Sequence, residues 1–157
     1  MSKKTSEEKR EIDVNALLAR INELRGYIEI LQNQVNTLAQ ELSELQLALA
    51  SIKGLSEVTD EREALIAVDR LATVFVPAKI SGSWSKNLLV NIGRNYYVKT
   101  DSATAEKIIS KRIGALQNLI RMRQQELSRA LNEYNYLQQI IAAAFYQAQA
   151  VSEQQKS

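Results

Sequence analysis

The sequence contains neither histidine nor cysteine. Without cysteine it can form neither disulfides nor thiolate metal sites, and a reducing compartment such as the cytoplasm is the simplest expectation. Without histidine it lacks the commonest general base and the commonest metal ligand of proteins. It also has no Walker loop and no Rossmann glycine pattern to hold a phosphate. We therefore expect no enzymatic activity and no metal or other cofactor.

Residues that interrupt regular structure are scarce as well. The 157 residues include one proline and five glycines, together with two phenylalanines and one tryptophan. So little proline and glycine predicts long, unbroken secondary-structure elements.

Charge and hydropathy limit the possible partners. A net formal charge of +2 gives no strong reason to expect nucleic acid or an anionic membrane. The longest uninterrupted apolar stretch is Ile140 to Tyr146, far short of the roughly 20 residues that cross a bilayer. Residues 1–13 are charged and lack the apolar core of a signal peptide. We expect a cytoplasmic protein that contacts neither membrane nor nucleic acid.

Two long stretches have the apolar spacing of a coiled coil. In residues 14–54 the gaps between apolar positions alternate between three and four, which is a heptad a/d register. Residues 102–148 repeat the pattern, with one polar residue among the apolar positions. Asp101 or Ser102 supplies an N-cap for this second helix. Because both stretches lie in one chain, we expect an antiparallel pair within the molecule. The first seam is Val14, Leu17, Ile21, Leu24, Ile28, Leu31, Val35, Leu38, Leu42, Leu45, Leu49 and Ile52; the second is Ile109, Ile113, Leu116, Ile120, Arg123, Leu127, Ala130, Tyr134, Leu137, Ile141, Ala144, Ala148 and Val151.

The segment between these stretches, residues 60–100, has the pattern of two β-hairpins. Leu88, Val90 and Ile92 alternate on one face, and Tyr96 and Val98 continue the period after the turn residues Gly-Arg-Asn. An earlier pair of strands is expected at 64–68 and 74–80, around the break "DRLAT". Four short strands are too few to shield both faces and all edges of a sheet. Both hairpins of residues 60–100 are therefore predicted to form an assembly platform with other subunits, and the five residues just named are its predicted assembly residues.

The order of these elements resembles the alpha-type subunit of prefoldin. The segment "KNLLVNIGRNYYVKTDSATAEKII" is similar to that family's last hairpin and second helix, and "EALIAV" with "FVPAKI" is similar to its first hairpin. Two hairpins are typical of the alpha type, whereas the beta type has one. The resemblance spans about residues 12–148. It implies an α+β fold and a single prefoldin-like domain over 1–157, with flexible ends at 1–13 and 149–157.

The resemblance also implies a function. Two alpha-type and four beta-type subunits would join their hairpins into an intersubunit double β-barrel that carries coiled-coil arms. Apolar arm tips would hold non-native polypeptides without ATP and pass them to a group II chaperonin. The tip residues would be Val14, Leu17 and Leu18 beside Ile141, Phe145 and Tyr146, with Leu18 and Phe145 facing outward.

Four alternatives remain open from the residues alone. The aromatics at the arm end could instead cover a frayed last turn, and Trp84 suits either an interface or a plug over the barrel end. A structural or tethering coiled coil would explain the two arms but not the hairpins. A nucleic-acid-binding arm would use Arg121, Arg123 and Arg129, yet interleaved glutamates favour a solvated flank.

Overall fold

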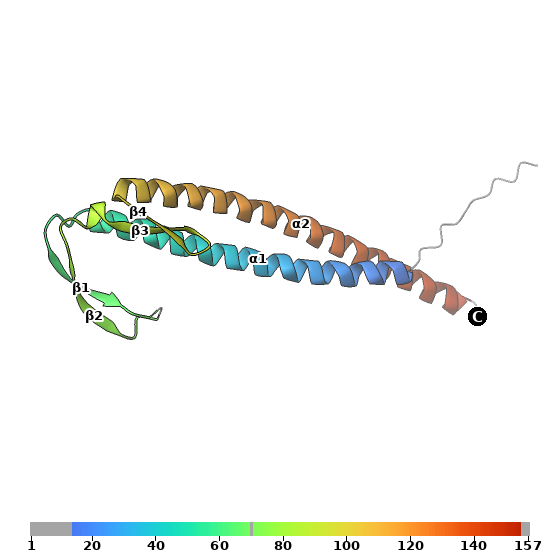
Figure 1. Cartoon of the computed structure of the whole chain (residues 1–157). Helices are drawn as coiled ribbons and strands as arrows, with labels where there is room; N and C mark the ends of the chain where they lie inside the picture. The colour runs from blue at the N-terminus through green and yellow to red at the C-terminus, as the bar shows by residue number, and fades with distance from the viewer. Residues whose placement is uncertain (1–13, 70, 155–157) are drawn as a thin grey trace, which may run out of the picture. The chain divides into compact units, whose positions relative to one another are not determined.

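The computed structural model describes residues 14–69 and 71–154 (Figure 1). Contacts divide the chain into two compact units. The arm unit contains the described residues of Met1–Asn36 and Arg121–Ser157, and the hairpin unit is Thr37–Ile120. The elements, in order, are α1 (Val14–Leu55), β1 (Arg62–Ala67), β2 (Phe75–Ile80), the short 3₁₀ helix η1 (Trp84–Lys86), β3 (Leu88–Gly93), β4 (Tyr96–Thr100) and α2 (Ser102–Gln154).

Both predicted helices and both predicted hairpins are present, which confirms the α+β fold, while the intersubunit barrel stays a prediction. The main difference lies at the end of α2, which continues past the predicted limit of 148 to Gln154. The added turns contain no proline or glycine and consist mostly of good helix formers, so nothing in the sequence stops the helix there. The predicted flexible ends, 1–13 and the last residues 155–157, lie outside the described residues.

The arm unit is held together by the predicted seam. The parts of α1 and α2 in this unit lie side by side and run antiparallel (Figure 1). Leu24, Ile28, Leu31 and Ala130 are buried between them, with Leu137 among the residues packed around this cluster. All twelve seam positions predicted in α1 are buried or half-buried, and nearly all other α1 residues are exposed. The heptad spacing therefore identified the buried stripe of the helix.

The hairpin unit has a second apolar cluster. Ile52 of α1 is buried with Ala105 and Ile109 of α2, and Val90 of β3 covers them. The start of α2 is fixed by Asp101, whose carboxylate accepts hydrogen bonds from the backbone N–H (2.8 Å) and the hydroxyl (3.0 Å) of Thr104. These bonds satisfy donors that the first turn of a helix leaves open, as expected of an N-cap.

The hairpin β3–β4 closes through a two-residue turn and contains a bulge. Arg94 and Asn95 adopt φ of 48° and 61°, the left-handed conformation that a type I′ turn requires. The strand register shifts between Asn91 and Gly93, where the Asn91 side chain accepts a hydrogen bond from the Gly93 N–H (2.7 Å). This bulge corrects the predicted alternation: Val90 is buried, but Ile92 is exposed rather than sharing its face.

The loop of hairpin β1–β2 is organised by Asp69. Its carboxylate accepts hydrogen bonds from the backbone N–H groups of Leu71, Thr73 and Val74, and from the Thr73 hydroxyl at 2.6 Å. These hydrogen bonds stabilise the charged form of the carboxyl group, and the bond from the Thr73 side chain has the largest effect. They lower the pKa of Asp69 from its usual 3.8 to about 2. In the segment expected as a break between the strands, the carboxylate of Asp69 thus ties together the described residues Leu71, Thr73 and Val74.

Core packing in the arm unit predicts a difference between two leucines of α1. Leu31 is 1% exposed, whereas Leu47 is 63% exposed. We expect Leu31→Ala to lower the free energy of unfolding by about 2–5 kcal/mol, because it removes buried methyl groups and leaves a cavity. Leu47→Ala should change it by less than about 0.5 kcal/mol. Urea unfolding followed by circular dichroism measures both, and similar losses for the two variants would contradict the packing described.

The turn at Asp69 predicts a pH dependence. Since its pKa is lowered in the folded hairpin, the carboxylate stabilises the turn above its usual pKa, and this contribution is lost as the pH falls through about 2. Thr73→Val removes the hydroxyl donor and keeps the backbone N–H, so the pKa of Asp69 should rise towards 3.8. A carbon-13 NMR titration of the carboxyl groups measures this change. Asp101, whose pKa is lowered by Thr104, is the internal control and should not move.

Candidate functional site

The hairpin β1–β2 presents apolar side chains on both of its faces. Ile66 lies opposite Val76 on one face, and Leu65 lies opposite Pro77 on the other. No residue described in β1 or β2 is fully buried. A two-stranded sheet with both faces in water is marginally stable, and exposed apolar patches mark contact sites. This hairpin therefore has the surface of an element that another chain covers.

Sequence reasoning predicted these strands but named none of their residues as an assembly site. The exposed apolar residues that it missed are Leu65, Ile66, Val68, Val74, Phe75 and Val76. The signal was present in "ALIAV" and "TVFVP". A continuous apolar run, without alternation, is typical of a strand covered on both faces.

Unpaired strand edges add to this surface. Within the described residues, β1 pairs only with β2 and β3 pairs only with β4, so each strand keeps one edge without a partner. Such edges carry rows of free N–H and C=O groups that readily pair with another strand. Both hairpins are therefore suited to forming larger sheets.

The five predicted assembly residues of β3–β4 fall into two groups. Val90 is buried and Leu88 is half-buried, both against the helices of the same unit. Ile92, Tyr96 and Val98 are exposed. The side chains of Leu88 and Val90 are already engaged within the chain, so only the other three offer side-chain contacts. The exposed residues Leu89 and Tyr97, which sequence reasoning did not name, belong to the same hairpin.

Trp84 has a structural role in its own unit. Its ring packs against the buried cluster of the hairpin unit, and its Nε1–H donates a hydrogen bond to the carbonyl of Val58 at 3.2 Å. Both contacts are made within the chain. They therefore support neither a role of Trp84 at an exposed interface nor a role as a plug over a barrel end.

The six predicted tip residues also differ in exposure. Ile141 is buried, and Val14 and Leu17 are half-buried in the seam. The others are exposed: Leu18 at 42%, Phe145 at 58% and Tyr146 at 75%. Three large apolar side chains therefore face solvent in the part of the arm unit that lies nearest the two ends of the described chain.

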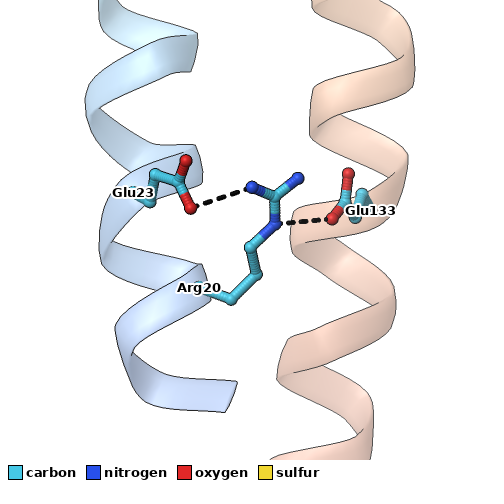
Figure 2. Close-up of polar contacts among 3 residues, drawn as sticks. All are labelled: Arg20, Glu23 and Glu133. Carbon is cyan, nitrogen blue, oxygen red and sulfur yellow. Dashed lines mark hydrogen bonds and ion pairs between the residues drawn. The ribbon is translucent and has the colours of Figure 1, made fainter. Parts of the chain in front are cut away.

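A salt bridge fixes the register of the two helices and corrects the expected tip geometry. Figure 2 shows Arg20 of α1 between Glu133 of α2 and Glu23 of its own helix, each at 2.9 Å. In an antiparallel pair this contact places Leu17 level with Tyr136. Phe145 and Tyr146 consequently lie on turns of α2 that extend past the first described residue of α1 (Figure 1), and not beside Leu17 and Leu18.

The described residues contain no group of three or more histidine, cysteine, aspartate or glutamate side chains able to hold a metal ion. In the same residues no helix is long and apolar enough to cross a membrane. Glu41 of α1 forms an ion pair with Arg112 at 3.4 Å. Such an exposed pair is typical of a solvated coiled-coil flank.

Comparisons with known proteins agree on one family. The family model described as "Prefoldin subunit" matches residues 13–147. The prefoldin subunit alpha of Sulfurisphaera tokodaii is 27% identical over 150 residues, covering 96% of each chain. That of Metallosphaera sedula is 27% identical over 133 residues, covering 85% of this chain and 90% of its own.

The chain is also similar to a solved structure. It is the cryo-EM structure of filamentous PFD from Methanocaldococcus jannaschii, with 24% sequence identity and a TM-score of 0.48. The match covers 82% of this chain and 95% of that one.

Proposed function

The chain belongs to the prefoldin family, whose members are chaperones and not enzymes, and from this premise we propose that it is the alpha-type subunit of an ATP-independent holdase. Its hairpins join those of beta-type subunits, in a complex of two alpha-type and four beta-type chains. Its coiled-coil tip binds non-native polypeptides in the cytoplasm, and the complex passes them to a group II chaperonin.

The observation that carries this proposal is the exposure of Leu18, Phe145 and Tyr146. A side chain of this size contributes about 1.5–3 kcal/mol when it is fully buried against a client. One such tip binds weakly, but several tips on one client add through effective concentration. Weak contacts of this kind suit a protein that must hold many different chains and release them.

Assembly is supported by the two apolar faces of β1–β2. Its residues belong to neither buried cluster of the chain, so the hairpin adds little to the stability of the isolated subunit. A tethering coiled coil, the other candidate, needs only the two helices and would leave these faces in water. Covering them with strands of other subunits removes both the exposed area and the free edges.

The first test addresses assembly. Leu65→Ser and Phe75→Ser together make one face of β1–β2 polar, and both residues are exposed in the isolated chain. We expect the double variant to keep its helix content by circular dichroism but to lose the complex with beta-type subunits, measured by light scattering after size exclusion. Leu47→Ser, an equally exposed leucine on α1, is the control and should assemble normally. A complex of full size formed by the double variant would contradict the assembly surface.

The second test addresses client binding. Replacing Leu18, Phe145 and Tyr146 by serine should leave the complex assembled, because all three side chains are exposed. We expect the concentration of complex that half-suppresses client aggregation to rise roughly three- to tenfold. The loss stays partial because beta-type arms also contribute. Unchanged protection of several clients, with Leu47→Ser as the reference, would count against the tip as the client site.

A further inference from the structure

The sole proline of the sequence, Pro77, lies within strand β2. Proline has no backbone N–H, so it removes one donor from the strand edge to which that N–H would point. Pro77 is paired with Leu65 of β1. If this pair is not hydrogen-bonded, the missing donor belongs to the free edge of β2, and the hairpin itself loses nothing.

One hydrogen bond at the end of the ladder decides which edge is affected. The N–H of Val68 donates to the carbonyl of Val74 at 3.1 Å, and this pair continues the register of β1 and β2. Hydrogen-bonded and non-hydrogen-bonded pairs alternate along an antiparallel ladder. Because the Leu65–Pro77 pair lies an odd number of positions from this one, it is not hydrogen-bonded. The backbone groups of Leu65 and Pro77 therefore point to the free edges of the hairpin.

The outer edge of β1 has a complete set of backbone groups. By the same alternation, the N–H and C=O groups of Glu63, Leu65 and Ala67 all point to it. None of these groups is hydrogen-bonded to another residue that the structure describes. All three residues are exposed. The edge of β1 can therefore form an uninterrupted ladder with an added strand.

The outer edge of β2 is interrupted. Its outward positions are Phe75, Pro77 and Lys79, and the middle one has no N–H. A strand added here would leave a carbonyl group near its centre without a donor, and an unsatisfied acceptor is costly once it is covered. Proline at a strand edge is one of the devices by which proteins prevent unwanted strand pairing. The hairpin thus has one edge that can pair and one that is blunted.

We propose that β1 is the pairing edge of hairpin β1–β2: a strand of a beta-type subunit adds to β1 through a main-chain ladder, and Pro77 keeps the β2 edge from forming an equivalent one. The inference rests on the proposed assembly and specifies the edge that carries it. It gives the hairpin a direction, because neighbouring subunits join it by hydrogen bonds on one side and by side-chain contacts alone on the other.

The side chains of β1 indicate what kind of strand is added. Leu65 and Ala67 lie on one face of the hairpin, and Ala64 and Ile66 lie on the other. Side chains of an added strand lie beside them on both faces, so that strand must be apolar on both faces as well. A single segment of a client would leave its own outer edge unpaired, whereas a hairpin of another subunit pairs that edge itself. Beta-type chains are the more numerous neighbours in the proposed complex, which makes them the expected partner.

The test compares proline with alanine at two positions that point to opposite edges. Leu65→Pro removes a donor from the β1 edge and Phe75→Pro removes one from the β2 edge, and neither donor is used within the hairpin. Leu65→Ala and Phe75→Ala keep the N–H and are the references. In light scattering after size exclusion, Leu65→Pro should need roughly ten times more beta-type subunit than Leu65→Ala for half-assembly. Phe75→Pro should match Phe75→Ala.

Equal assembly of Leu65→Pro and Leu65→Ala would overturn the inference. An equal loss caused by Phe75→Pro would overturn it too, because the β2 edge would then carry a ladder as well. Circular dichroism of each variant alone checks that the helices are kept. An ester in place of the amide at Leu65 removes the same donor but keeps the leucine side chain, and it should reproduce the loss.

Amide hydrogen exchange of the native chain tests the edge without a substitution. When beta-type subunits bind, the N–H of Leu65 should become protected, and that of Phe75 should exchange at close to its rate in the free chain. Protection of Phe75 without protection of Leu65 would overturn the inference. So would protection of Leu65 in the isolated chain or with a denatured client alone, since a second copy or a client would then occupy the edge.

The inference and the assembly proposal fail in different ways. If the Leu65→Ser/Phe75→Ser variant loses the complex while Leu65→Pro and Leu65→Ala assemble alike, the apolar faces carry assembly and the pairing edge is wrong. If the native chain forms no complex with beta-type subunits, both are wrong.

Discussion

The structure depends on one narrow apolar seam. Two helices that pack only against each other can bury one stripe of each, and every other side chain faces solvent. The seam residues of α1 meet this constraint almost without exception, from Val14 to Ile52. Because each helix contributes so little buried area, a few fully enclosed side chains such as Leu31 and Ala105 carry much of the packing. The same constraint leaves the flanks free to carry charge, as in the Arg20–Glu133 bridge.

The hairpins are subject to a different physical constraint. Two strands cannot enclose a core, and the two hairpins solve this in different ways. The hairpin β3–β4 places Val90 against the helices of its own unit, whereas β1–β2 leaves both faces exposed. Hairpin β3–β4 is thus covered on one face within the chain, whereas β1–β2 has no fully buried residue among those described. Membership of the prefoldin family, whose subunits assemble with one another, gives this incomplete hairpin a purpose.

Much of the fold could be predicted because its signals are local. Heptad spacing identified the seam, alternation identified β3 and β4, apolar runs identified β1 and β2, and an N-cap at Asp101 or Ser102 marked the start of α2. The exposure of Ile92 could not be predicted, because a bulge breaks the alternation there. The Gly93 N–H donates a hydrogen bond to the Asn91 side chain at this bulge. The relation of Phe145 to Leu18 depends on helix register, which the Arg20–Glu133 bridge reveals only in three dimensions. The role of Trp84 depended likewise on a distant partner, Val58.

The position of Trp84 has a spectroscopic consequence. It is the sole tryptophan of the sequence, and its indole ring lies against the cluster of the hairpin unit with its N–H bonded to Val58. Indole emission therefore reports on that unit alone, whereas the arm unit contains the tyrosines Tyr27, Tyr134, Tyr136 and Tyr146 but no tryptophan. Tryptophan emission of the native chain thus follows melting of the hairpin unit and distinguishes it from fraying of the arm, without any added label.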